Sequence, residues 1–90
     1  PGLVSPKLNS VVQTTTATLE WTASDVDNDT LVFDIFFGTQ NPPLQKLSAN
    51  QSETILNVEV ASSKEYFWKV VVKDSKGAQS IGQVWNFKTD

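Results

Sequence analysis

The stretch Glu65-Tyr66-Phe67-Trp68-Lys69-Val70-Val71-Val72-Lys73-Asp74 decides how this chain folds. Aromatic and β-branched residues fill it, and such residues favour a pleated, largely buried strand. Successive side chains of a strand point to opposite faces, and one face here carries only apolar or aromatic residues: Tyr66, Trp68, Val70 and Val72. The other face is mixed and carries Phe67, Lys69, Val71 and Lys73. The stretch predicts a central β-strand whose first face packs in the core and whose second face meets solvent or a partner.

Shorter segments on both sides show the same alternation of apolar and polar residues. In residues 16–23, for example, Ala17, Leu19 and Trp21 share one face and polar side chains take the other. No segment shows a helical period with caps. Strands are expected at 3–6, 11–12, 16–23, 31–37, 45–48, 54–60, 65–74 and 81–89. About seven short strands separated by turn signals predict an all-β sandwich.

The pattern also predicts how two of these strands pair. If residues 31–37 run antiparallel to residues 66–72 with Phe33 opposite Val70, every inward pair is apolar or aromatic. The outward pairs are then Val32 with Val71, Asp34 with Lys69, and Phe36 with Phe67. The middle pair joins opposite charges, which favours this register.

The three tryptophans, Trp21, Trp68 and Trp85, all fall on inward faces of the expected strands. A hairpin centred on Lys76-Gly77 would place Trp85 opposite Trp68. Tryptophans can serve as stacking platforms for sugars when they are exposed. Because these three point inward, we interpret them as core residues that bury a large area.

The composition argues against several classes of function. The 90 residues, enough for one small domain, contain no Cys and no His. Disulfides, thiolate metal sites, cysteine nucleophiles and imidazole bases are therefore absent. The formal net charge is −3, and no basic stripe for nucleic acid is visible. No apolar run approaches the ~18 residues of a membrane span. We expect no enzymatic activity, no nucleic-acid partner and no membrane insertion.

Several patterns together resemble a fibronectin type III-like domain over nearly the whole chain. Val60 lies six residues before Tyr66, which is the spacing of that family's tyrosine corner. Leu19-Glu20-Trp21 matches the inward Trp of the family's second strand, and residues 33–38 match the aromatic-x-aliphatic-x-aromatic-Gly pattern of the third. Three further segments look like the version found in bacterial cell-surface and secreted multidomain proteins: 3–6, 25–29 and 84–89.

The resemblance implies an immunoglobulin-like β-sandwich of about seven antiparallel strands, with residues 1–90 forming a single domain. It implies a non-catalytic structural or interaction module, a spacer or docking domain, of an extracellular or cell-surface protein. Its partners would be neighbouring domains of the same chain or another protein. The chain opens on Pro-Gly without an initiating Met or a signal peptide, so we expect a piece excised from a longer chain. The integrin-binding Arg-Gly-Asp is absent from the loop Asp74-Ser75-Lys76-Gly77, so that adhesion role is not carried over.

An acidic loop offers an alternative function, because Asp25, Asp27 and Asp29 are spaced like the first three ligands of a Ca²⁺ loop. The helical Ca²⁺ motif itself fails, since its sixth and twelfth places lack the required Gly and Glu. The register given above would bring Asp74 close to Asp29, and a hard cation would relieve the repulsion among four carboxylates. The simpler interpretation is a solvated loop whose Asp side chains cap turns. A Ca²⁺- or carbohydrate-binding accessory module is therefore the alternative function.

The outward face of the central strands is the second candidate site. Val32, Phe36, Phe67 and Val71 would form an apolar patch there. Contiguous exposed apolar surface often marks contact with a partner. Cover by a neighbouring loop, or ordinary packing between strands, is the other interpretation of this interaction surface.

Overall fold

All regular structure in the described part of the chain is β-strand. The computed structural model describes residues 2–23 and 30–90. Its nine strands are β1 (Gly2–Ser5), β2 (Val11–Val12), β3 (Thr16–Thr22), β4 (Val32–Gly38), β5 (Lys46–Gln51), β6 (Ile55–Glu59), β7 (Glu65–Lys73), β8 (Gln79–Ile81) and β9 (Trp85–Thr89). The all-β prediction is confirmed. Nothing in these residues forms a helix long and apolar enough to cross a membrane.

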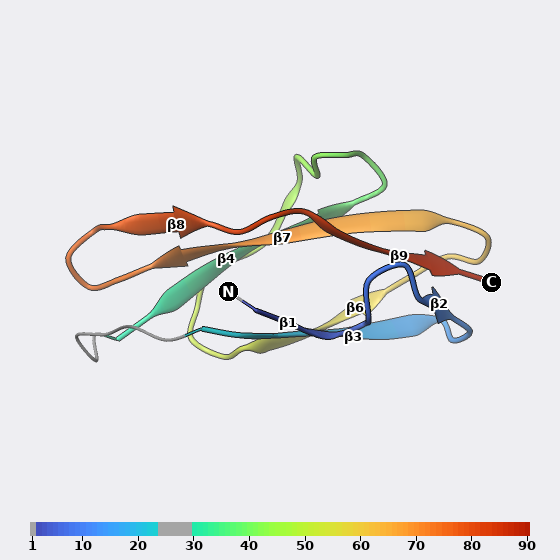
Figure 1. Cartoon of the computed structure of the whole chain (residues 1–90), viewed down its shortest axis with the longest axis horizontal. Coiled ribbons are helices and arrows are strands. Elements are labelled where there is room, and N and C mark those ends of the chain that lie inside the picture. The colour runs from blue at the N-terminus through green and yellow to red at the C-terminus, as the bar shows by residue number, and fades with distance from the viewer. Residues whose placement is uncertain (1, 24–29) are drawn as a thin grey trace.

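The strands form two sheets that lie in two layers (Figure 1). The smaller sheet has the order β1-β3-β6, and the larger sheet has the order β2-β9-β7-β4-β5 with β8 also paired to β7. Every neighbouring pair is antiparallel except β2 with β9, which is parallel. Because β7 pairs with β4, β8 and β9, it is the central strand of the larger sheet, as the sequence predicts. The arrangement is a β-sandwich.

Aromatic rings from both sheets fill the space between the layers. Trp68 of β7 is fully buried and lies between Trp21 of β3 and Trp85 of β9, with ring centroids 6.0 and 4.8 Å away. A second group of aromatic rings stacks nearer the β6–β7 connection, where the ring centroids of Tyr66 and Phe37 are 5.0 Å apart. The tryptophans are therefore core residues, as their inward positions predict, and none of them offers an exposed ring. Trp85 lies opposite Trp68 in the β7–β9 ladder, as predicted. The β7–β8 hairpin itself is centred on Lys76 rather than on Lys76-Gly77, and one extra residue between β8 and β9 restores the Trp68–Trp85 pair.

The β4–β7 register differs from the predicted one by two residues. Phe33 lies opposite Val72 rather than Val70, and Asp34 lies opposite Val71 rather than Lys69. A shift of two residues leaves every side chain on its original face, so the hydrophobic pattern cannot distinguish the two registers. Asp34 reaches two lysines and one backbone N–H in the observed register, whereas the predicted pairing supplied it with one lysine. The ion-pair argument for the predicted register was therefore wrong.

The last expected strand, 81–89, is also divided in the structure. β8 and β9 are separated by residues 82–84. Between the pairs Val71–Ile81 and Trp68–Trp85 the outer strand has one more residue than β7, so the segment bulges there. Gly82 lies in this bulge and donates its N–H to the carbonyl of Val70 at 2.9 Å. The prediction of one continuous strand was wrong, and a Gly inside a strand pattern is the signal that indicated the break.

Two hydroxyl groups hold the connection between β6 and β7. The hydroxyl of Tyr66 accepts a hydrogen bond from the Ala61 N–H at 2.8 Å. The hydroxyl of Thr89 donates to the Ala61 carbonyl at 2.5 Å and accepts from the Lys64 N–H at 2.8 Å. Ala61 is thus bound through both of its backbone groups, and the crossing from one sheet to the other is fixed without a disulfide.

Trp68→Ala should lower the free energy of unfolding by about 3–5 kcal/mol, because it removes a large buried ring and leaves a cavity between the sheets. Denaturant melts followed by far-UV circular dichroism would measure the loss. Thr16→Ala, on the exposed face of β3, is the control and should cost less than about 1 kcal/mol. A neutral Trp68→Ala would mean that the two faces of β7 are assigned the wrong way round.

Tyr66→Phe and Thr89→Val should each lower the free energy of unfolding by about 1–3 kcal/mol, because each leaves backbone groups of the β6–β7 connection without a partner. Since both hydroxyls act on Ala61, the double variant should cost less than the sum of the single variants. Urea melts of the four proteins complete this cycle. Strict additivity would show that the two hydroxyls stabilise independent parts of the structure.

Candidate interaction face

The outer face of the larger sheet, which points away from the smaller sheet, carries a row of charged and aromatic side chains. Phe36 of β4 lies opposite Lys69 on β7 and opposite Lys46 on β5. The two ammonium nitrogens lie 4.8 Å (Lys69) and 5.6 Å (Lys46) from the centroid of the Phe36 ring. Cations at this distance are attracted by the negative face of an aromatic ring. These three residues are called the Lys–Phe–Lys row below.

Asp34, two residues before Phe36 on the same face, is buried with 6% of its surface exposed. Its carboxylate binds Lys73 at 3.1 Å and Lys46 at 3.3 Å, and it accepts the Asn50 N–H at 2.9 Å. The Lys73 ammonium also donates to the side-chain oxygen of Asn50 at 2.6 Å. A buried carboxylate is tolerated only when it is paired and hydrogen-bonded in this way. The network therefore fixes the end of β5 and two lysines around one acidic group.

The balance of forces on Asp34 keeps it ionised. Burial by itself raises the pKa of this carboxyl, because it disfavours the charged form. The Asn50 N–H and the ammonium groups of Lys73 and Lys46 outweigh that effect and hold the pKa below its ordinary value. At neutral pH, Lys46, Lys69 and Lys73 therefore face one negative charge, which leaves an excess of two positive charges. The whole chain has a formal net charge of −3, so this face has the opposite sign to the molecule.

The predicted patch of Val32, Phe36, Phe67 and Val71 lies on this same face. Val71 is buried, with 7% of its surface exposed, and the other three are half-buried. Phe67 lies opposite Gly38, so it is not the direct cross-strand partner of Phe36. Whether a partner binds this patch stays a prediction, and the lysines around it give it a more polar character than its sequence pattern indicated.

Three residues of this face were not singled out from the sequence: Lys46, Lys73 and Ile81. Ile81 of β8 lies opposite Val71 and exposes 69% of its surface beside the row. Lys73 was assigned to the outward face but not to an ion pair, because the register was two residues off. The short β5 strand gave no signal for the position of Lys46, since its pairing with β4 is irregular. The correct register would have indicated Lys73, as diagonal neighbours on a sheet lie within reach of long side chains.

The other candidate site is only partly visible. Asp25, Asp27 and Asp29 lie outside the described residues, and Asp74 alone can be placed. The Asp74 carboxylate accepts the N–H groups of Lys76 and Ala78, each at 2.9 Å, and so caps the turn between β7 and β8. Within residues 2–23 and 30–90 no three acidic side chains gather closely enough to hold a metal ion. The Ca²⁺ site stays a prediction.

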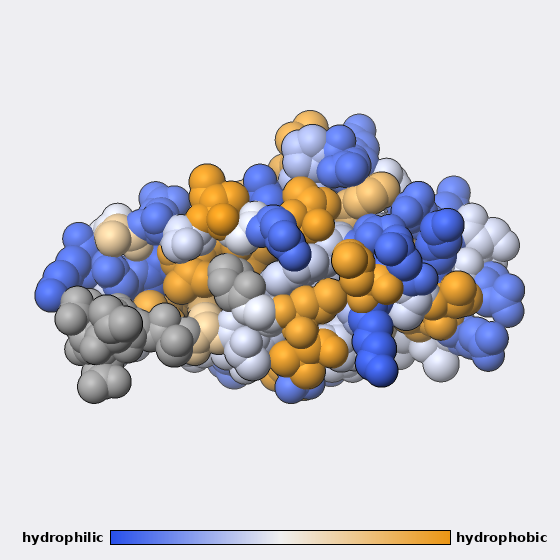
Figure 2. All heavy atoms as spheres, viewed as in Figure 1, coloured by the Kyte–Doolittle hydropathy of each residue, from blue (hydrophilic) through white to orange (hydrophobic). Residues whose placement is uncertain are grey.

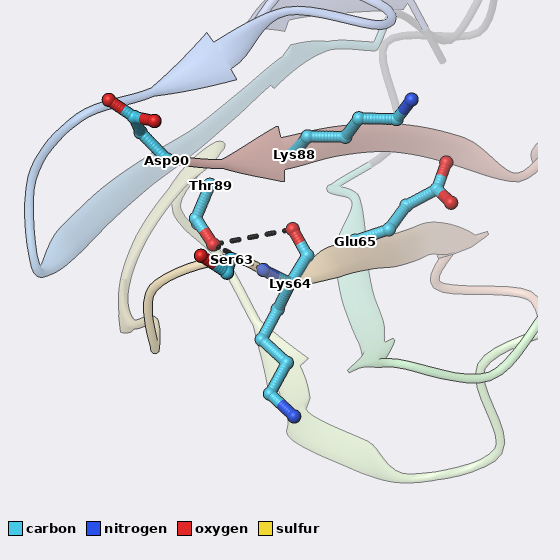
Figure 3. Close-up of a pocket in the computed structure, with 6 residues that line it drawn as sticks. All are labelled: Ser63, Lys64, Glu65, Lys88, Thr89 and Asp90. Carbon is cyan, nitrogen blue, oxygen red and sulfur yellow. Dashed lines mark hydrogen bonds between the residues drawn. The ribbon is translucent and has the colours of Figure 1, made fainter.

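A shallow polar pocket of about 410 Å³ lies where β9 ends beside the start of β7 (Figure 3). Ser63, Lys64 and Thr89 lie together there, but Figure 3 shows the Lys64 side chain pointing away from both hydroxyls. The Thr89 hydroxyl is already engaged with the backbone of the β6–β7 connection. The described residues of this pocket therefore support the fold and do not form a nucleophile with a base.

A second hollow, of about 450 Å³, lies between β5 and β6, the outermost strands of the two sheets on that side. Its walls are mainly apolar, with Phe37 and Leu56 at the base and Leu47 at the rim. Figure 2 shows the surface on the side drawn in Figure 1, where apolar side chains gather over the middle of the long axis and hydrophilic ones dominate the end at which β9 finishes. The hollow offers apolar contact but no charged group except Glu59.

Comparison with known proteins leaves the geometry as the main guide to function. No protein-family model matches the chain, and no curated protein matches it in sequence.

Asp34→Asn should lower the free energy of unfolding by about 1–3 kcal/mol at neutral pH, because it removes the negative charge that binds two lysines and replaces one of the two acceptor oxygens by an NH₂ group. The folded-state pKa of Asp34 lies below its unfolded value, so its stabilising effect is complete above the unfolded pKa of about 3.9 and is lost as the pH falls through the lower, folded value. Melts between neutral pH and strong acid should therefore show the gap between wild type and variant closing in acid.

The matched control is Asp90→Asn, the same chemical change at an exposed position. Its unfolding free energy should differ little from that of the wild type at every pH. A gap for Asp34→Asn that stays constant down to strong acid would contradict the assignment of an ionised, stabilising carboxylate.

Proposed function

We propose that this protein is a non-catalytic interaction module that binds a protein partner through the outer face of its larger sheet. The observation that carries the proposal is the Lys–Phe–Lys row beside the Asp34 network. A buried carboxylate holds two lysines in place around half-buried apolar residues, on a face that no other strand of the described chain covers. Aromatic side chains ringed by polar groups are typical of the centre of a protein interface.

We further propose a fibronectin type III-like sandwich as the framework of this module. The strand order supports it, because β1-β3-β6 faces β9-β7-β4-β5, with each sheet built mainly from antiparallel neighbours. The hydrogen bond of the Tyr66 hydroxyl to the Ala61 N–H supports it as well, since a tyrosine at the start of a late strand binds upstream backbone in this way in immunoglobulin-like sandwiches. Such domains serve as spacers and docking surfaces in multidomain proteins, and the extracellular or cell-surface location rests on this resemblance alone.

The alternative of a carbohydrate-binding module has less support. Sugar binding commonly needs an exposed aromatic ring, and all three tryptophans are buried with at most 2% of their surface exposed. The ring of Phe36 is half-buried and has an ammonium group near it from each side strand. Protein binding therefore accounts better for the features of this face.

The test compares lysine reactivity in two contexts, the 90-residue domain and the full-length product of its gene. If the outer face is a docking surface between domains, Lys46 and Lys69 should react several-fold more slowly with an amine-methylating reagent in the full-length protein. Lys7 and Lys64, exposed elsewhere in the structure, serve as internal controls and should react equally in both. Tandem mass spectrometry of tryptic peptides gives each rate. Equal rates for all four lysines in both contexts would contradict a docking role within that protein.

A further inference from the structure

We infer that the partner of the outer face is an acidic, extended protein segment in which a carboxylate and an apolar side chain alternate on the same side. This inference rests on the proposed docking function and names the chemistry of the partner.

A net positive charge remains on the face. Asp34 binds Lys46 and Lys73, so one carboxylate is shared by two ammonium groups. Lys69 lies over the Phe36 ring, and residues 2–23 and 30–90 bring no carboxylate within ion-pair distance of it. The Lys46 side chain is also 47% exposed, so its ammonium group can pair with a second carboxylate from a binding partner. An acidic partner complements the excess of two positive charges, and complementary charge selects partners and speeds encounter.

Exposed apolar surface lies beside that charge. Ile81 of β8 exposes 69% of its surface on the same face as Val71, its partner on β7. An anionic polysaccharide would satisfy the lysines but would not bury an isoleucine. A protein segment can satisfy both, because a carboxylate and an apolar side chain can alternate along it. The combination therefore favours an acidic protein segment over an acidic glycan.

The spacing of the charge and the apolar surface suits one extended segment. Lys69 lies two residues from Val71 on β7, and Ile81 lies one strand further from Val71. With a rise of about 3.4 Å per residue and about 4.8 Å between strands, Lys69 and Ile81 are separated by about 8 Å. Residues i and i+2 of an extended chain point to the same side and lie about 7 Å apart. A segment with the pattern acidic-x-apolar can therefore place its carboxylate at Lys69 and its apolar side chain at Ile81.

The experiment titrates the isotope-labelled domain with synthetic peptides and follows its amide signals by NMR. The probe is a twelve-residue peptide that repeats Glu-Ser-Leu-Ser, and the first control replaces each Glu by Lys. We expect the acidic peptide to shift the amides of Phe36, Lys69 and Ile81, and the basic peptide to leave them unchanged. Binding should weaken as the salt concentration rises, because exposed charges are screened beyond about 10 Å at 0.1 M ionic strength.

Two variants of equal charge test the position of the site. Lys69→Gln should weaken binding of the acidic peptide by about fivefold, the upper range for one exposed ion pair. Lys64→Gln removes the same charge just before the start of β7 and should leave the affinity unchanged. Ile81→Ser should also weaken binding, and the factor between the affinities of wild type and variant should not change with the salt concentration. Tryptophan fluorescence of each variant would establish that it is folded.

Each contrary result overturns a definite part of the inference. Equal loss in Lys69→Gln and Lys64→Gln would mean non-specific attraction to the charge of the domain. Tighter binding of polygalacturonate than of the acidic peptide at the same amides would identify an anionic glycan instead. No binding of the acidic peptide, together with slow methylation of Lys69 in the full-length protein, would leave the docking function intact and refute the acidic partner. Binding of the peptide without any protection in the full-length protein would support the partner chemistry and refute docking within that chain.

Discussion

The contact of Trp68 with Trp21 and Trp85 is the interaction on which the rest of the structure depends. Trp21 comes from the smaller sheet, while Trp68 and Trp85 are neighbours in the larger one, so this cluster joins the two layers. All three rings are at most 2% exposed. In a chain of 90 residues without Cys, such a cluster must replace the covalent links that many small domains use. Because β7 carries Trp68 inward, its alternate residues are obliged to face outward, and this places Phe67, Lys69 and Val71 on the other side of the sheet.

This two-sided constraint explains which features the sequence predicted well. The faces of β3, β4 and β7 follow from apolar alternation, and the structure has them as expected. The pairing of Trp85 with Trp68 was predicted from a hairpin turn, but in the structure it also depends on the extra residue between β8 and β9, because the register next to the turn is shifted by one residue. The β4–β7 register was harder, because these strands are joined through two further strands rather than by a turn. Registers that differ by two residues then have the same faces, and they are distinguished by contacts such as those of Asp34 with Lys73 of β7 and with Lys46 and Asn50 of β5.

The charged part of the candidate site is formed by contacts between β5 and β4, so it could not be predicted from the sequence. Its apolar part could be predicted. Val32, Phe36, Phe67 and Val71 could be assigned to one face by counting residues. Lys46 comes from β5, whose pairing with β4 shifts its register twice over a few residues. The alternation of apolar and polar residues in the sequence does not predict such irregular pairing. The role of Asn50 is likewise tertiary, since its N–H meets Asp34 only where β5 ends beside β4. Local sequence patterns do not predict a tertiary contact of this kind.

The Asp34 network shows how the fold positions the surface that we propose as functional. Its carboxylate is buried on the outer side of the sheet, where the hydrophobic core gives it no stabilisation. It is held instead by Lys46, Lys73 and the backbone of Asn50. Lys46 is thereby fixed at a strand edge on one side of Phe36, and the register that satisfies Asp34 also sets Lys69 opposite Phe36 on the other side. The Asp34 network thus links the observed β4–β7 register to the placement of the cationic groups on the face that we propose as the binding surface.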